Sequence, residues 1–177
     1  TMHQVKVVLS DVDRGVYETL ELRLARHPSE TLRYLLTRLL GYALSYEEGI
    51  VFSKAGLSDT EEPPISIVDL TGVRQAWIEV GWPSADRLHK ASKATKRVAT
   101  YTWVDVAHLR REAASRPIHR LDDIGVWRFD PDLLLALEAV VDRKFELDVM
   151  RTGGQLYVTT GGKTYEGALE ALSLSQS

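Results

Sequence analysis

The chain has 177 residues, of which 44% are hydrophobic, and its formal net charge is −3. This length suits one well-buried core, so we predict a single domain over residues 1–177. The absence of cysteine excludes disulfides, zinc–cysteine sites and thiol catalysis. The net negative charge argues against a protein that coats nucleic acid over its whole surface, so any contact with DNA or RNA has to be local.

The hydropathy pattern bears on location. No stretch approaches the roughly 20 apolar residues that span a membrane. The first residues alternate polar and apolar side chains, and they lack the basic segment and apolar run of an export signal. We therefore expect a soluble, cytoplasmic protein with no membrane partner.

The first part of the chain predicts a hairpin followed by a helix. Residues 4–10 and 16–24 alternate apolar and polar, and they flank a turn rich in Asp and Gly. Leucines then recur with the helical period, which predicts a helix over 30–45 that begins near Pro28 and Ser29. The side chains expected to be buried along it are Leu32, Leu36, Leu39, Leu40 and Ala43.

The middle of the chain predicts a sheet flanked by helices. The elements expected there are, in order, strands at 50–53, 65–68 and 73–80, a helix at 84–95 and a strand at 98–104. Turn residues at 69–72 join the second and third strands in an antiparallel hairpin. Together with the first helix, this order is typical of an α/β protein with a mixed central β-sheet.

The last part of the chain adds further helices and strands. The pattern there predicts helices at 105–115 and 130–141 and strands at 124–129, 144–150, 155–160 and 163–168. Glycine pairs at 153–154 and 161–162 suit the turns between the last three strands.

Charged residues cluster in the middle of the chain. One short stretch carries the basic residues Arg87, Lys90, Lys93, Lys96 and Arg97. A segment before it carries the acids Asp59, Glu61 and Glu62. This pattern is compatible with a basic rim beside an acidic metal pocket, although an ordinary solvated helix face is the more frequent origin of such a cluster.

Three short sequences carry a family resemblance: residues 24–31 (LARHPSET), 77–81 (WIEVG) and 87–91 (RLHKA). Residues 61–63 and 69–72 fit the same pattern. Together they resemble the YaeQ family over almost the whole chain. The resemblance implies a PD-(D/E)XK (restriction-endonuclease-like) core of helix, three strands, helix and strand, to which the N-terminal hairpin and the C-terminal strands are additions.

The resemblance also implies a magnesium-dependent site. Nucleases of this type place one acid before the middle strand, a second acid inside the next strand and a lysine two residues later. Glu79 matches the second acid, but Gly81 stands at the lysine position and Pro64 where YaeQ relatives tend to carry an acid. Lys90 is a candidate for a displaced lysine, since it shares a helix face with Arg87. Its alternative is a surface lysine paired with Asp86.

The residue pairing expected for the hairpin selects the second metal ligand. A turn near residues 71–72 pairs Glu79 with about position 64, so Glu62 lies just beyond it. Asp69 would lie roughly 16 Å along the strand from Glu79, which makes it a turn residue. Magnesium prefers carboxylate oxygens, so Glu62 and Glu79 are the predicted ligands.

Other residues complete the predicted site. Glu30 is a candidate auxiliary acid, and its alternative is a carboxylate favoured by the helix dipole. Arg87 and Lys90 are candidates to contact phosphate or water, and one of these two cations is expected within about 6 Å of Glu79. Trp77 and Trp82 are interpreted as packing residues.

Three functions are compatible with these residues. The leading hypothesis is a magnesium-dependent nuclease-like protein that acts on DNA or RNA phosphodiesters. The main alternative is a nuclease fold that has lost hydrolysis and binds nucleic acid or protein. A third is an interaction protein without a nucleic-acid role.

Overall fold

A computed structural model describes residues 1–54 and 62–175 of the chain. The fold divides into two compact units, each built from two separate stretches. Unit 1 comprises Thr1–Tyr46 and Phe129–Leu169, and unit 2 comprises Glu47–Arg128 and Glu170–Ser177. The single domain over 1–177 stays a prediction.

Unit 1 contains the predicted N-terminal hairpin and C-terminal strands. Its strand order is β2-β1-β8-β9-β10. The strands are β1 (Met2–Asp11), β2 (Val16–Ala25), β8 (Lys144–Thr152), β9 (Gln155–Thr160) and β10 (Lys163–Ser173), the last of which continues into unit 2. β1 pairs antiparallel with β2 and parallel with β8, so the sheet is mixed. The hairpin predicted at the N-terminus is confirmed.

Helices α1 (Leu32–Leu44) and α4 (Pro131–Glu138) belong to the same unit. Leu36, Leu39, Leu40 and Ala43 of α1 are fully buried, as the leucine stripe predicts. Leu32 is only half-buried, which corrects the prediction. It opens the helix, and helical side chains lean toward the N-terminus, so Leu32 has no preceding turn to lie against.

Unit 2 contains the strands and helices that were predicted for the middle of the chain. Beside the end of β10, its strand order is β7-β6-β5-β4-β3. The strands are β3 (Ile50–Phe52), β4 (Ile65–Val68), β5 (Arg74–Val80), β6 (Arg97–Thr102) and β7 (Gly125–Phe129). β3, β4 and β5 pair antiparallel, whereas β5, β6 and β7 pair parallel. The predicted mixed sheet and antiparallel hairpin are therefore confirmed.

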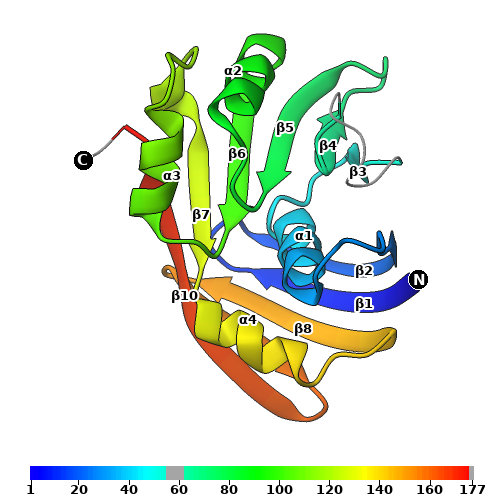
Figure 1. Cartoon of the computed structure of the whole chain (residues 1–177). Helices are drawn as coiled ribbons and strands as arrows, with labels where there is room; N and C mark the ends of the chain where they lie inside the picture. Colours follow the sequence, from blue (N-terminus) through cyan, green and yellow to red (C-terminus); the bar gives the residue numbers. More distant parts are fainter. Residues whose placement is uncertain (55–61, 176–177) are drawn as a thin grey trace. The chain divides into compact units, whose positions relative to one another are not determined.

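Helices connect the parallel strands of unit 2, as parallel pairing requires. α2 (Ala85–Ala94) follows β5 and α3 (Val106–Ala113) follows β6, and a short 3₁₀ turn, η2 (Leu121–Asp123), precedes β7. Both helices pack on one face of β5, β6 and β7 (Figure 1). The core between them is formed by Trp77, Leu88, Ala91, Leu109 and Val126 with their neighbours. Within the described residues, no helix is long and apolar enough to cross a membrane.

Candidate functional site

Glu79 is the sixth residue of β5 and is buried beneath α2, with 3% of its surface exposed. Residues two apart on a strand share a face, so Trp77 lies beside it. The Oε1 atom of Glu79 accepts a hydrogen bond of 2.7 Å from Trp77 Nε1 and one of 2.7 Å from Arg87 Nε. The prediction of a cation within 6 Å of this carboxylate is confirmed, and the cation is Arg87.

Arg87 reaches Glu79 from the first turn of α2. The Oγ atom of Ser84 caps this helix by accepting from Arg87 N, which fixes where α2 begins. A second guanidinium nitrogen of Arg87, Nη2, donates to the backbone carbonyl of Glu62 at 2.9 Å. Arg87 therefore links α2, β5 and the segment before β4.

The electrostatics of Glu79 are dominated by its burial. Loss of hydration raises the pKa of this carboxyl above its usual value, while the charge of Arg87 and the hydrogen bonds from Trp77 and Arg87 act in the opposite direction. A buried carboxylate is costly unless it is paired, so Trp77 and Arg87 supply the partners that this position needs. Trp77 was interpreted as a packing residue. It does pack in the core, but the hydrogen bond to Glu79 is a second role, for which the Trp-x-Glu spacing on one strand face was the available signal.

The residue pairing predicted for the hairpin is confirmed by the register of β4 and β5. Ile65 pairs with Ile78, so the next position, Pro64, faces Glu79. Asp69 is a turn residue, because its carboxylate accepts from Thr71 N and Val73 N, both at 2.9 Å. These bonds, with that from the Thr71 hydroxyl as the largest effect, lower the pKa of Asp69.

Glu62 lies just before this hairpin and is half-buried. Its Oε2 atom accepts from Ser53 Oγ at 3.3 Å, and its Oε1 atom lies 4.0 Å from Arg74 Nη2. The group that meets Arg87 is the backbone carbonyl of Glu62. The predicted acids Asp59 and Glu61 lie outside the described residues.

The donor set around Glu79 can be compared with the needs of magnesium. Magnesium requires several oxygen ligands with free lone pairs. In this site one oxygen of Glu79 already accepts two hydrogen bonds, one from the Trp77 indole and one from the Arg87 guanidinium. Among the described residues, no three His, Cys, Asp or Glu side chains group as metal ligands. The set fits magnesium poorly, and magnesium binding by Glu62 and Glu79 stays a prediction.

Basic residues gather on the outer side of α2. Lys90 and Lys93 are exposed there, and Asp86 forms an ion pair with Arg116 of the segment after α3. Backbone N–H of His119 donates to His89 Nδ1 at 3.0 Å, and the Ser92 hydroxyl donates to the carbonyl of His119. These bonds fasten the segment to α2. We call His89, Lys90, Lys93, Arg116 and His119 the basic patch.

The positive charges of the basic patch affect the pKa of His89. Desolvation first, and then the positive charges of Arg116 and Lys93, lower the pKa of His89. Residues 87–120 contain nine Lys or Arg and only two Asp or Glu, although the whole chain is acidic. Of the predicted basic stretch, Arg97 forms an ion pair with Glu47 at 2.7 Å. Lys90 and Lys93 are the members of that stretch that belong to the basic patch, and a basic rim that contacts DNA or RNA stays a prediction.

Glu30 lies in unit 1, outside the helix where the sequence placed it. α1 begins at Leu32 with Thr31 as its cap, so Glu30 precedes the first turn. Its Oε2 atom lies 3.2 Å from Arg38 Nε, and its Oε1 atom accepts from His27 N at 3.1 Å. Both Glu30 and Arg38 are buried. These bonds hold the segment before α1 in place. The role of Glu30 as an auxiliary acid stays a prediction.

Trp82 was interpreted as a packing residue, and it is one only in part, through ring contacts with Trp103 and His108. It lies between β5 and α2 with 54% of its surface exposed. The exposure of Trp82 was not predicted, because a tryptophan beside a buried strand is normally part of the core.

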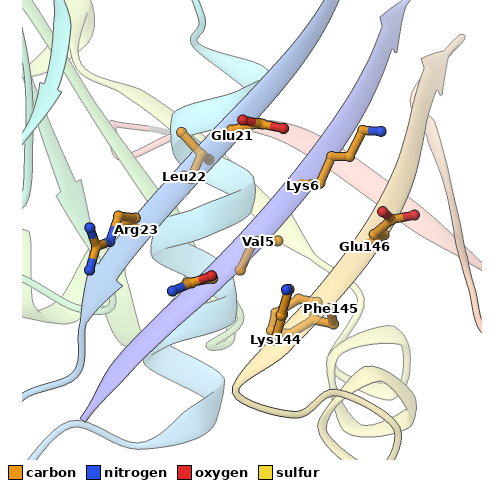
Figure 2. A pocket seen from close by; sticks show the side chains of 9 residues that line it. Val5, Lys6, Glu21, Leu22, Arg23, Lys144, Phe145 and Glu146 are labelled. Atoms are coloured by element: carbon orange, nitrogen blue, oxygen red, sulfur yellow. The ribbon is translucent and has the colours of Figure 1, made fainter.

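A groove of about 750 Å³ lies in unit 1, across β2, β1 and β8. Figure 2 shows its charged side chains. In the strand register Lys6 lies between Glu21 and Glu146, and the neighbouring row places Arg23 and Lys144 on either side of Gln4. The groove contains none of the predicted site residues.

Known proteins match the chain over nearly its full length. The family model described as YaeQ protein matches residues 1–169. Proteins named "Uncharacterized protein YaeQ" are similar: that of Escherichia coli (strain K12) is 27% identical and that of Salmonella typhi 28%, each over 97% of this chain and 94% of the relative.

Two crystal structures of YaeQ proteins are also similar. That of the Pseudomonas syringae protein is 33% identical with a TM-score of 0.87, over 98% of this chain and 96% of that one. That of the Xanthomonas axonopodis pv. citri protein is 27% identical with a TM-score of 0.88, over 98% of each.

Proposed function

This protein belongs to the YaeQ family, and from that premise we propose that it binds nucleic acid through a PD-(D/E)XK (restriction-endonuclease-like) core that has lost hydrolysis. The observation that carries the proposal is the Arg87 guanidinium on the Glu79 carboxylate, 2.7 Å away. An arginine in this position satisfies the acid that a nuclease would offer to a metal. The acid then stabilises the fold and orients α2.

Two backbone positions support the loss of hydrolysis. Gly81, at the position of the nuclease lysine, has a φ of 91°, a conformation that L side chains rarely adopt. A lysine there would be strained. Pro64, which faces Glu79, is buried and brings no carboxylate. The lysine and one acid of the nuclease pattern are therefore both replaced by residues that shape the backbone.

The basic patch supports the choice of nucleic acid as ligand. Clustered cations on one helix and the adjacent segment neutralise phosphates, and this supplies most of the affinity of such proteins. An acidic chain that concentrates its cations in residues 87–120 suits a local contact with a phosphate backbone. The proposal assigns this activity to the cytoplasm, with which the absence of cysteine is compatible.

The test is a binding titration against salt. Labelled DNA and RNA are titrated with the wild type and with the double variant Lys90→Ala/Lys93→Ala. The slope of log K against log salt is negative, and each lost phosphate contact is expected to reduce its magnitude by about 0.7 to 0.9. The matched control, Lys144→Ala/Lys163→Ala, removes the same charge from exposed positions in unit 1 and should bind like the wild type. Equal slopes for all three proteins would contradict the proposal.

A magnesium-dependent nuclease is the second candidate function. It is favoured by Glu79, an acid held in β5 at the position the nuclease pattern requires, beside a cation able to contact phosphate. Lys90 and Glu62 are its further participants, with Glu30 as auxiliary acid. Magnesium-dependent cleavage that is lost in Glu79→Ala would support this function over simple binding.

A further inference from the structure

The ends of β5 and β6 bring two tryptophans together. β5 and β6 are parallel, and Val80 pairs with Tyr101. The N–H of Gly81 donates to the carbonyl of Tyr101 at 2.8 Å, so the pairing extends past the strand end. Continued by two residues, the register sets Trp82 beside Trp103. The ring centroids of these two tryptophans are 5.7 Å apart, at an interplanar angle of 78°.

His108, on the first turn of α3, completes this aromatic cluster. Its ring centroid lies 6.5 Å from that of Trp82, at an interplanar angle of 85°. Near-perpendicular ring pairs of this kind stabilise one another beyond the area they bury. Trp82 is therefore supported by Trp103 and His108, while more than half of its surface faces solvent.

Exposure of this degree distinguishes Trp82 among the tryptophans of its unit. Trp77 is 1% exposed, and Trp103 and Trp127 are half-buried. The left-handed conformation of Gly81 turns the chain at the end of β5, directly before Trp82. The residue that replaces the nuclease lysine thus allows the turn that leads into an exposed aromatic ring.

Cations lie on the elements that follow the two tryptophans in the chain. α2 begins three residues after Trp82, and its first-turn residue Asp86 holds Arg116 of the basic patch. Arg111 is exposed on α3 one turn after His108. Aromatic rings beside a cationic surface are the combination with which proteins bind single-stranded nucleic acid, because bases stack on the rings while cations contact the phosphates.

We propose that Trp82 is a stacking platform for one base of a single-stranded DNA or RNA whose backbone follows the basic patch. This inference rests on the proposed function and names its ligand. In a duplex, the bases are stacked on one another and do not present a free face to Trp82. A protein partner for the same ring is the competing occupant, and it would leave nucleic-acid binding independent of Trp82.

The test compares four probes by fluorescence anisotropy: a labelled oligo-dT strand, an oligo-rU strand, an abasic strand of equal length and a duplex. Trp82→Ala is expected to weaken binding to the single strands by about 5- to 150-fold, the loss typical of one stacked base. Trp82→Phe, which keeps an aromatic ring, should retain most of the affinity. The wild type should bind the abasic strand as weakly as Trp82→Ala binds oligo-dT. The ratio of the dT and rU affinities distinguishes DNA from RNA as the preferred strand.

Two controls separate the possible failures. Leu135→Ala removes a leucine of α4 that is 59% exposed, and it should leave binding unchanged. If Trp82→Ala binds single strands like the wild type while Lys90→Ala/Lys93→Ala does not, the stacking platform is wrong and the proposed function stands. If the wild type binds none of the four probes, both proposals are wrong. Thermal unfolding by circular dichroism verifies that each variant is folded.

Discussion

Each unit of the molecule contains a buried glutamate paired with an arginine eight residues later in the chain: Glu30 with Arg38 in unit 1, and Glu79 with Arg87 in unit 2. The spacing is the same, but the surroundings differ. The side chain of Arg38 is 7% exposed and that of Arg87 is 23% exposed. Arg38 also donates to the carbonyl of Ala25, at the end of β2, at 3.0 Å. The first pair is closed within the core, whereas the second is partly open to solvent on the side of Arg87.

A buried acid with a cationic partner is therefore not by itself a catalytic signal. Glu30 and Arg38 join the end of β2 to α1, a role that stability alone explains. Glu79 and Arg87 also stabilise their unit, but Glu79 is the acid for which the nuclease-like hypothesis predicts a metal, and it lies three residues before the exposed Trp82. The neighbouring residues, more than the acid itself, distinguish a structural ion pair from a functional site.

The largest effect is expected when the closed pair is broken. Arg38→Ala leaves the Glu30 carboxylate buried without its cation, so the free energy of unfolding should fall by about 3 to 5 kcal/mol. Urea denaturation measures this. Arg33→Ala breaks a more exposed pair with Glu138 and should cost about 1 kcal/mol or less. Similar losses for the two variants would show that Glu30 does not depend on Arg38.

Breaking the open pair should cost less. Arg87→Ala is expected to lower the free energy of unfolding by about 2 to 3 kcal/mol, because Trp77 still donates to Glu79 and the carboxyl can take up a proton. Adding Glu79→Gln to Arg87→Ala should recover part of the loss, as double-mutant coupling requires. A loss as large as that of Arg38→Ala would remove the distinction between the two pairs.

The indole of Trp77 should contribute a smaller amount. Trp77→Phe keeps an aromatic ring in the core but removes the donor to Glu79, so a loss of about 1 to 2 kcal/mol is expected. The same substitution in a Glu79→Gln background should cost less, since a neutral acceptor forms a weaker bond. Equal costs in the two backgrounds would mean that packing alone accounts for Trp77.

The pH dependence of Glu79 should be the smallest effect. Burial holds its pKa in the folded protein above the value of about 4.3 for an unfolded glutamate. The folded state then binds more protons between these two pKa values, so stability falls as pH rises through that window. The free energy of unfolding of the wild type minus that of Glu79→Gln should therefore decrease with rising pH. A difference that increases would contradict the raised pKa.

The sequence predicts much of the fold for identifiable reasons. The leucine stripe of α1 and the turns at 69–72 and 153–154 are local signals, and the register derived from the first turn correctly pairs Glu79 with Pro64. The Arg87 contact was predictable because α2 has to return across the sheet. The Glu30–Arg38 pair was not, since an arginine within a leucine-rich stripe is normally taken as solvent-facing.

The aromatic cluster could not be predicted for a different reason. It depends on the parallel pairing of β5 with β6, which brings Trp82 and Trp103 together from positions 21 residues apart. Hydrophobic periodicity within one element carries no information on such a contact. The exposure of Trp82 depends further on the left-handed conformation of Gly81, which the glycine permits but does not require.

The most direct test of the central claim, that this fold binds nucleic acid and has lost hydrolysis, is one titration performed in excess EDTA and again in magnesium. A labelled single strand is titrated with the wild type and with Lys90→Ala/Lys93→Ala, and the same samples are examined for cleavage products. We predict that the wild type binds in EDTA, so that binding does not require magnesium, that the double variant binds more weakly in both conditions, and that the strand remains intact. Cleavage that requires magnesium and disappears in Glu79→Ala would contradict the claim.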